Sequence, residues 1–476
     1  MSAAAECIMT PPTFGFPKEN DLSRSCWLLS VEGDPLLNHV TTPKLPASAD
    51  IVVIGSGMTG TLVAKHCIDT WAEKSVVVLE AREFCSGATG RNAGHCKPDQ
   101  WRGFAAYEED FGTEQAFKIL ENEQQTWSDL VTYVKDNHVD CDLWVGDTLD
   151  VPVTPEAAKK AKNTFERFKA AGGNVDHIKV TQNPSQAAEL SRIKDAQACY
   201  AWPASTLHPW KLAAHVMREN LKKGVNLQTH TRVNEVVPSQ DSPGKWIVKS
   251  RRGDIECRQV VHANNAYSSA LEPSLRGLVR PRPHLCNEVK PPSTYAGSKA
   301  LKNSYGVLFS EGAFISINPR IPLQGSVLFG GSNLGQPEFE KWLQDHPERC
   351  IDDGLTDFEP VSKAVQDFAE SEFTGWPPAK GPTEFHKHSW SGIIAMTMDG
   401  VPFVGELPGL PGQWICAGHN GHGMARIFTA APGLVRLMGG RPWAETNLPE
   451  VYQFTPTRLA KLRKRLDLED KHFPKL

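Results

Sequence analysis

Three glycines separate an apolar run from an amphipathic stretch and could hold a phosphate. Gly55, Gly57 and Gly60 have the spacing G-x-G-x-x-G. In such a turn the first glycine permits the tight bend, the second admits a pyrophosphate and the third lets helix and strand pack closely. Glu80 follows Gly55 by 25 residues, where a carboxylate can accept hydrogen bonds from both hydroxyls of a ribose. The spacing predicts a dinucleotide site, and the acid disfavours the 2′-phosphate of NADP.

The segments around these glycines have the right character to position them. "ADIVVIG" (49–55) is a short, β-branched apolar run typical of a buried parallel strand. Residues 58–73 have helical spacing, and "SVVVLEA" (75–81) is a second buried strand. A strand, glycine turn, helix and strand form a βαβ unit, which makes an unrelated glycine turn the weaker alternative. The small-residue loop "AREFCSGATGRNAGH" (81–95) would wrap a ligand longer than a pyrophosphate, which favours FAD over NAD.

Four blocks resemble the FAD-dependent oxidoreductases of the D-amino acid oxidase, glycine oxidase and sarcosine oxidase superfamily. The greatest likeness is to the branch of gamma-glutamylputrescine oxidase and its fungal relatives. The blocks are "VVIGSGMTG" (52–60), "LEAREFCSGATGRNAGH" (79–95), "LHPWKL" (207–212) and "WSGIIAMTMDGVPFVGELPGLPGQWICAGHNGHGM" (390–424). They follow the family order over residues 48–440, so the resemblance is specific for the fold and much less so for the substrate.

The resemblance implies which residues hold FAD. The pyrophosphate would be lined by Gly55, Ser56, Gly57, Met58, Thr59 and Gly60. The adenosine ribose would be held by Glu80, with Ala81 and Arg82 beside it. The diphosphate and the isoalloxazine ring would be followed by Ser86, Gly87, Ala88, Thr89, Arg91, Asn92, Ala93, Gly94 and His95. Val233 would offer backbone groups to the adenine. The pyrimidine edge of the flavin would be closed over by Gly421, His422, Gly423 and Met424.

Catalytic residues are harder to assign, because the flavin performs the hydride transfer itself. The candidates are Arg91, His95 and His422. An arginine there could stabilise flavin charge, and a histidine could place a hydrogen bond or favour a neutral amine. The alternatives are a phosphate or backbone contact for Arg91 and a satisfied buried imidazole for His95. His419 and His422 lack a third ligand, so no metal site is predicted.

Two departures from the family pattern concern cofactor attachment. Arg91 stands where one branch attaches FAD through histidine, and Gly392 stands where another uses cysteine. Non-covalent FAD is therefore expected. Cys85 and Cys96 are the remaining attachment points, and small buried packing residues are the favoured alternative for both.

A further departure concerns the substrate wall. Residues 279–289 lack the family's Gly-Gln turn, and in "FISINPR" (314–320) Ile317 and Asn318 replace a polar pair. Arg282 and Arg320 are weak candidates for holding a substrate carboxylate.

The leading hypothesis is an oxidase or dehydrogenase that acts on a C–N bond of an amine, amino acid or N-substituted amino compound, with O2 as acceptor. A second hypothesis is dehydrogenation or oxidative cyclisation of a bulky, less polar substrate, motivated by the altered wall. A non-catalytic flavin-binding protein and a flavin-free NAD dehydrogenase are the remaining alternatives.

The expected fold class is α/β: a Rossmann-like FAD-binding domain with a parallel sheet, interleaved with a substrate domain on a mixed or antiparallel sheet. An arm whose "CWLL" anchors it would precede both domains. The expected segments are the arm (1–47), the FAD-binding parts (48–108, 196–273 and 387–445), the substrate parts (109–195 and 274–386) and a tail (446–476).

Composition limits the partners and the compartment. The net charge of −4 over 476 residues argues against nucleic acid as a partner, and no apolar run is long enough to span a membrane. Eleven scattered cysteines without C-x-x-C and the absence of a signal peptide indicate an intracellular, cytoplasmic protein. The tripeptide Pro474-Lys475-Leu476 differs by one residue from the peroxisomal address, although an accidental tail is the slightly favoured alternative.

Overall fold

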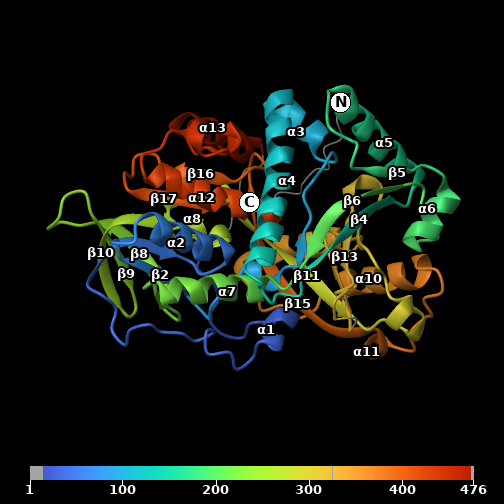
Figure 1. Cartoon of the computed structure of the whole chain (residues 1–476), viewed down its shortest axis with the longest axis horizontal. Coiled ribbons are helices and arrows are strands. Elements are labelled where there is room, and N and C mark those ends of the chain that lie inside the picture. Colours follow the sequence, from blue (N-terminus) through green and yellow to red (C-terminus); the bar gives the residue numbers. More distant parts are fainter. Residues whose placement is uncertain (1–13, 324, 473–476) are drawn as a thin grey trace.

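The computed structural model describes residues 14–323 and 325–472, which build two large β-sheets with helices around them (Figure 1). The first sheet has the order β16-β17-β10-β1-β2-β7, with β9 and β8 continuing from β10. Its pairs β1–β10, β1–β2, β2–β7 and β10–β17 are parallel. Its strands are β1 (Ser48–Ile54), β2 (Val76–Leu79), β7 (Asn226–Gln228), β8 (Val233–Pro238), β9 (Trp246–Ser250), β10 (Gly253–His262), β16 (Phe403–Glu406) and β17 (Gln413–Ala417).

The second sheet has the order β15-β11-β14-β13-β12-β4-β6-β3, with β5 paired to β6. Its neighbours are antiparallel except for the parallel pair β12–β4. Its strands are β3 (His95–Cys96), β4 (Trp144–Pro152), β5 (Lys179–Thr181), β6 (Cys199–Thr206), β11 (Val279–Val289), β12 (Ser304–Leu308), β13 (Phe314–Asn318), β14 (Val327–Gly330) and β15 (His386–Thr397). The predicted α/β class with one mainly parallel and one mainly antiparallel sheet is confirmed.

The helices lie around both sheets, and α4 stands between the two halves of the molecule (Figure 1). Helix α2 packs against α7 and α12, and α12 also packs against α4. The helices are α1 (Cys26–Ser30), α2 (Met58–Thr70), α3 (Phe104–Phe111), α4 (Thr113–Asp136), α5 (Pro155–Ala170), α6 (Pro184–Ser191), α7 (Pro209–Lys222), α8 (Ser268–Leu271), α9 (Gln336–Asp345), α10 (Glu359–Glu372), α11 (Pro382–Phe385), α12 (Ile427–Met438) and α13 (Pro456–His472).

The glycine turn between β1 and α2 has the tight geometry that its sequence predicts. Gly55 adopts φ +108°, which is unfavourable for a residue with a side chain. A Cβ on Gly60 would lie 1.8 Å from the carbonyl oxygen of Gly55. The helix therefore begins in direct contact with the end of the strand, as the third glycine of the motif requires.

Some segments differ from the sequence-based expectations. The helical stretch over 104–136 is two helices, because Gly112 adopts φ +82° between α3 and α4. Strands β3, β6 and β15 pair in the second sheet although they fall largely in segments assigned to the FAD-binding domain, so the segment boundaries remain predictions. The "CWLL" stretch forms α1, and Cys26, Trp27 and Leu28 are buried as expected.

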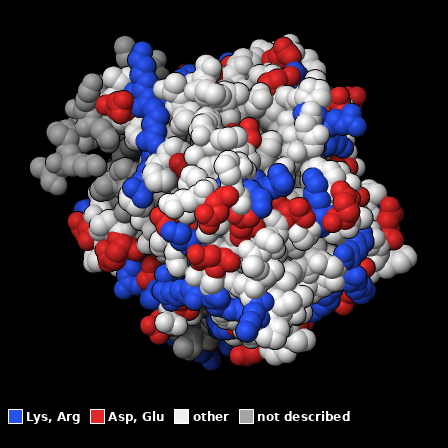
Figure 2. Space-filling view, turned by 90° about the vertical axis from the view of Figure 1, so that its left-hand side faces the viewer, with Lys and Arg blue, Asp and Glu red and all other residues white. Residues whose placement is uncertain are grey.

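The surface shows no single dominant charge on the face that Figure 2 presents. Acidic and basic side chains are interspersed there, in keeping with the small net charge. None of the helices in the described ranges is both long and apolar enough to cross a bilayer. The C-terminal tripeptide lies outside the described residues, so the peroxisomal alternative remains untested.

Replacement of Gly60 by alanine is expected to destabilise the protein. The added methyl group must separate β1 from α2, and overpacking of this kind costs about 1–3 kcal/mol. Gly381→Ala is the matched control, because a Cβ at Gly381 would meet nothing within 4 Å. Chemical denaturation of both variants measures the difference. Equal free energies of unfolding would show that the turn can open without cost.

His208 should make stability fall in acid. Its Nδ1 accepts the backbone N–H of Lys211 at 3.3 Å and caps α7, while its Nε2 lies 2.9 Å from Ser30 Oγ. Burial, reinforced by Lys211 and Arg320, lowers the pKa of His208 to about 3. The contribution of neutral His208 to the free energy of unfolding is therefore complete above the unfolded-state pKa near 6.5, and it declines as the pH falls below that value.

His208→Asn retains a capping side chain that does not titrate. Denaturation at pH 7, 6 and 5 should give a shallower loss of stability than in the wild type, by up to about 1.4 kcal/mol per pH unit. Parallel pH profiles of the two proteins would contradict this assignment.

Candidate active site

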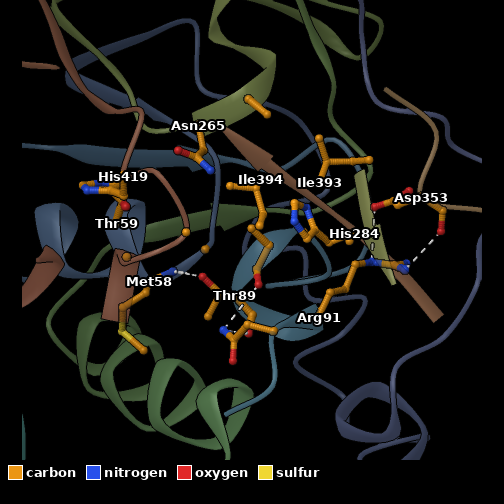
Figure 3. A pocket seen from close by; sticks show the side chains of 18 of the residues that line it. Met58, Thr59, Thr89, Arg91, Asn265, His284, Asp353, Ile393, Ile394 and His419 are labelled. Atoms are coloured by element: carbon orange, nitrogen blue, oxygen red, sulfur yellow. Dashed lines mark hydrogen bonds and ion pairs between the residues drawn. The ribbon is translucent and has the colours of Figure 1, made fainter. Parts of the chain in front are cut away.

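A cavity of about 510 Å³ joins the two sheets. One end is formed by the β1–α2 turn, Glu80 and the loop that follows β2. The other end is formed by strands β11, β13, β14 and β15 of the second sheet, and residues 419–425 close one side. The glycine motif and the antiparallel sheet therefore face one continuous space, part of which is drawn in Figure 3.

Most of the residues implied by the family resemblance line this cavity. They are Gly55, Gly57, Met58, Thr59, Glu80, Ala81, Arg82, Gly87, Ala88, Thr89, Arg91, Asn92, Ala93, His95, Val233, Gly421, His422, Gly423 and Met424. The structure brings these residues together from five separate segments of the chain. Their individual contacts with FAD remain predictions.

Four of the implied residues do not line the cavity. Ser56 Oγ donates to Glu80 and accepts from the backbone of Cys85, and Gly60 packs on Gly55. The carbonyl of Ser86 accepts from Arg91, and Gly94 packs tightly against the carbonyl of Leu207. Ser56, Gly60, Ser86 and Gly94 therefore shape the wall of the cavity from behind, and their contacts with FAD remain predictions.

Glu80 is held in a fixed orientation at the end of β2. One carboxylate oxygen accepts the backbone N–H and the hydroxyl of Ser56 at 3.0 and 2.7 Å, and the other accepts the backbone N–H of Arg82 at 3.0 Å. A carboxylate offers about four acceptor positions. One position is left for a hydroxyl in the cavity, which fits a ribose.

The start of α2 is suited to an anion. Gly57 is the N-cap and has no side chain with which to cap the helix. The backbone N–H of Met58 donates to Thr89 Oγ1 at 3.0 Å, and both residues line the cavity (Figure 3). The free N–H groups and the positive end of the helix dipole favour a phosphate at this position.

Arg91 points toward Asp353 (Figure 3). Its Nε lies 3.2 Å from Asp353 Oδ2, and its other nitrogens donate to Ser23 and to the carbonyls of Asp353 and Ser391. Arg82 donates to the same carboxylate at 2.8 Å. A guanidinium with this many protein partners has the environment of a positioning residue, so the candidate role of Arg91 in catalysis gains no support.

His95 has the opposite environment. It lines the cavity on β3, and both of its ring nitrogens are buried without a hydrogen-bond partner among the described residues. Burial, with a smaller effect of Lys97, lowers the pKa of His95 to about 3. A neutral imidazole with two unused nitrogens beside a cavity indicates a ligand, because buried polar atoms are otherwise hydrogen-bonded.

Two cationic side chains beside His95 were not singled out from the sequence. Lys97 Nζ lies 2.5 Å from Asp150 Oδ1, and Arg102 Nη1 lies 3.3 Å from Asp150 Oδ2. Both cations line the cavity, whereas Asp150 is fully buried. The Nε and Nη2 of Arg102 donate to no acceptor within the described ranges, so this guanidinium can still bind an anion.

Strand alternation decides which residues of the second sheet face the cavity. Phe314 and Ser316 line it, while Ile317 lies in the apolar core and Asn318 donates to the carbonyl of Ala93. Ile317 therefore lies on the opposite face of β13, and Asn318, on the same face as Phe314 and Ser316, is bound to Ala93. Neither residue lines the cavity as expected. His284, also missed from sequence, lines the cavity and contacts Ser332 Oγ at 3.2 Å.

Arg282 and Arg320, the two candidates for binding a substrate carboxylate, lie in different environments. Arg282 lines the cavity and forms an ion pair with Glu340. Arg320 does not line it, because its guanidinium pairs with Glu288 at 3.3 Å and lies over the ring of Trp27. The structure therefore leaves Arg320 outside the site.

The environment of the cysteines fits non-covalent attachment. Cys85 and Cys96 are buried, neither lines the cavity, and burial raises the pKa of both thiols. Gly392 does line the cavity, and a Cβ there would come within 3.1 Å of Arg91 Cβ. Non-covalent FAD remains a prediction supported by these positions.

The residues present fit FAD. The helix start suits a diphosphate, Glu80 suits a ribose, and the unpartnered nitrogens of His95 lie in the part of the cavity built by the second sheet. Among the described residues no group of three or more His, Cys, Asp or Glu side chains could hold a metal ion.

Comparison with known proteins agrees with this fit. Residues 50–437 match the family model DAO, described as FAD dependent oxidoreductase. A probable oxidoreductase OrdL of Rhizobium meliloti is 22% identical over 390 residues, which cover 80% of this chain and 81% of that protein. Gamma-glutamylputrescine oxidoreductase of Escherichia coli is 23% identical over 412 residues, 84% of this chain and 87% of that protein.

A solved structure shows the same fold. Glycine oxidase from Geobacillus kaustophilus superposes with a TM-score of 0.64 at 17% identity, covering 86% of this chain and 99% of that one. The family model spans most of the chain, and the cavity has the groups that a long dinucleotide needs. The chain therefore belongs to the FAD-dependent oxidoreductases of the DAO family and uses FAD as its cofactor.

Proposed function

We propose that the protein oxidises a C–N bond of an amine that also carries a carboxylate, such as an amino acid or an N-substituted amino acid, and passes the electrons to O2. The observation that carries the proposal is one continuous cavity, which joins the dinucleotide motif to the unpartnered imidazole of His95 and to two lining cations. Relatives named for gamma-glutamylputrescine and glycine oxidation support the same chemistry.

The reaction balances as a two-electron oxidation. The substrate C–H bond breaks with its electron pair, the nitrogen loses a proton, and a C=N bond forms. When bound, FAD supplies the acceptor for the hydride. Water then adds to the imine and releases a carbonyl compound and an amine or ammonia. Transfer of the electrons to O2 would give hydrogen peroxide.

The protein's part is to hold the amine neutral and close to the cofactor. His95 is neutral near pH 7 because its pKa is lowered to about 3, so one ring nitrogen can accept a hydrogen bond from the substrate nitrogen. Lys97 stands beside it and disfavours a second positive charge, such as an ammonium group. Apolar side chains of Phe314, Ile393 and Ile394 limit the access of water to the same space.

Arg102 is the proposed partner of the substrate carboxylate. Its unused Nε and Nη2 can form two parallel hydrogen bonds to a carboxylate. Asp150 fixes the opposite side of the guanidinium, and the ring of Phe314 lies 4.8 Å from its central carbon. The guanidinium group of Arg102 is therefore held in place before the substrate enters.

The alternative of a bulky, less polar substrate receives less support. The lining of the cavity includes the cations Lys97, Arg102 and Arg282. A large apolar substrate would leave the open donors of Arg102 at the cavity without an acceptor, which is unfavourable in a buried site.

Arg102→Met should raise the KM for amino-acid substrates by roughly 10-fold or more, since a hydrogen bond to a charged group contributes about 1.5–3 kcal/mol. The KM for an amine of the same size without a carboxylate should change little. Arg167→Met is the matched control, because Arg167 is an exposed arginine paired with Glu108 in the same half of the molecule. Steady-state kinetics on both substrates measure the split. An equal loss on both would contradict the assignment to the carboxylate.

Anaerobic mixing with a panel of amines and amino acids tests the reaction. At least one amino acid or N-substituted amino acid should bleach the visible flavin band, and admission of air should restore it with one hydrogen peroxide per flavin. A flavin that no member of the panel reduces would remove the proposed chemistry. Rapid bleaching with no reoxidation by air would show that the electron acceptor is not O2.

A further inference from the structure

A buried carboxylate lies behind the loop that closes the cavity. Glu123 belongs to α4, and its side chain is completely shielded from solvent. Its Oε1 accepts Nε of Arg426 at 2.8 Å, and its Oε2 accepts the backbone N–H of Asp99 at 2.8 Å. The same Oε2 lies 3.3 Å from Nδ1 of His422. No sequence motif includes Glu123.

The ionised state of Glu123 follows from these partners. Burial raises its pKa, but His422, Arg426 and the backbone N–H of Asp99 outweigh burial and lower the pKa to about 2. An ionised carboxylate only accepts hydrogen bonds. The hydrogen between Glu123 and His422 therefore resides on Nδ1 of the imidazole.

This arrangement leaves one ring atom of His422 for a ligand. The residue lines the cavity, and about a third of its side chain is exposed. Its Nε2 forms no hydrogen bond to any residue within 14–323 and 325–472. With the proton fixed on Nδ1, Nε2 is the acceptor in the neutral ring and a second donor in the protonated ring.

We propose that Glu123 is a positioning residue for His422, holding the proton on Nδ1 so that Nε2 is presented to FAD in the cavity. The carboxylate comes from α4 and orients a side chain of residues 419–425, which close one side of the cavity. The inference rests on FAD binding alone and does not depend on which substrate is oxidised.

Arg426 explains how the carboxylate can be buried. Its guanidinium also donates to Tyr107 Oη at 2.9 Å and to the carbonyl of His419 at 3.3 Å. Glu123 is therefore neutralised by a residue that is itself anchored on two other segments. Because Arg426 holds Glu123 in place, the carboxylate can orient the ring of His422 without moving itself.

A double-mutant cycle on FAD affinity tests the inference. The variants are Glu123→Gln, His422→Asn and the double variant, each stripped of FAD and titrated with FAD. Each single change should weaken binding by roughly 10-fold, the scale of one hydrogen bond near a charged group. Glu123→Gln should add no more than about twofold in the His422→Asn background, because residues that act through one another are not additive.

A second readout needs no cofactor. In protein labelled with 15N-histidine, the His422 signals, identified by their loss in His422→Asn, should show the Nδ1–H tautomer. In Glu123→Gln the tautomer preference should shift toward Nε2–H. If Glu123→Gln does not fold, Glu123→Asp serves instead, because it keeps the charge for Arg426 and draws the carboxylate back from His422.

Asp399→Asn is the matched control. Asp399 forms a bidentate pair with Arg458 at 2.9 Å for each contact and does not line the cavity. This variant should lose stability while FAD affinity stays within about twofold of the wild type. Additive losses in the cycle, or an unchanged tautomer in Glu123→Gln, would overturn the inference. A failed substrate panel beside a non-additive cycle would reject the proposed reaction and leave this inference standing.

Discussion

The arrangement of the cavity depends on the buried ion pairs that the carboxylate of Asp353 forms with two arginines. Asp353 pairs with Arg82 at 2.8 Å and with Arg91 at 3.2 Å, and all three side chains are almost completely buried. Asp353 comes from the segment between α9 and α10, whereas both arginines follow β2. Removing one partner of a buried pair typically costs about 3–5 kcal/mol. The contact between the loop after β2 and the segment that joins α9 to α10 therefore depends on these charges remaining together.

The N-terminal arm takes part in the same cluster. Ser23 donates its hydroxyl to the carbonyl of Asp353 at 2.6 Å, and its own carbonyl accepts from Arg91 at 2.7 Å. Beyond it, Phe16 and Pro17 line the cavity near the first sheet. Three segments far apart in the chain thus meet at one buried charge cluster. The charged side chains of this cluster are all paired, which holds the three segments together beside the cavity.

The proposed chemistry lies where donors and acceptors at the cavity stay open. Among the described residues, both ring nitrogens of His95 are buried without a partner, and Arg102 and His422 keep nitrogens free at the cavity. Two of these side chains are held by a buried carboxylate, Arg102 by Asp150 and His422 by Glu123, while Lys97 lies beside His95 at the cavity. Such fixed charges orient groups in advance, so that little reorganisation is needed when a ligand enters.

The fold and the cofactor could be predicted from the sequence because their determinants are local. Gly55, Gly57 and Gly60 encode a tight turn in which helix and strand approach too closely for any side chain. Glu80 lies at the end of the next strand, a position that depends only on the local βαβ unit. The two helices over 104–136 were predicted as one, because the left-handed conformation of Gly112 is not visible in a helical periodicity.

The catalytic side was decided by the tertiary structure. The partners of Arg91, Asp353 and Ser23, come from distant segments that carry no motif, and a catalytic role of Arg91 remains a prediction. Ile317 proved to face away from the cavity, because alternation along β13 places it on the face opposite Phe314 and Ser316. Asn318 shares the face of Phe314 and Ser316, but its amide is bound to the carbonyl of Ala93. Glu123, Asp150 and Arg102 had no signal in the sequence at all. A glycine turn is specified by the dihedral angles of adjacent residues, whereas a buried charge gains its function only from the groups that folding brings within hydrogen-bond distance.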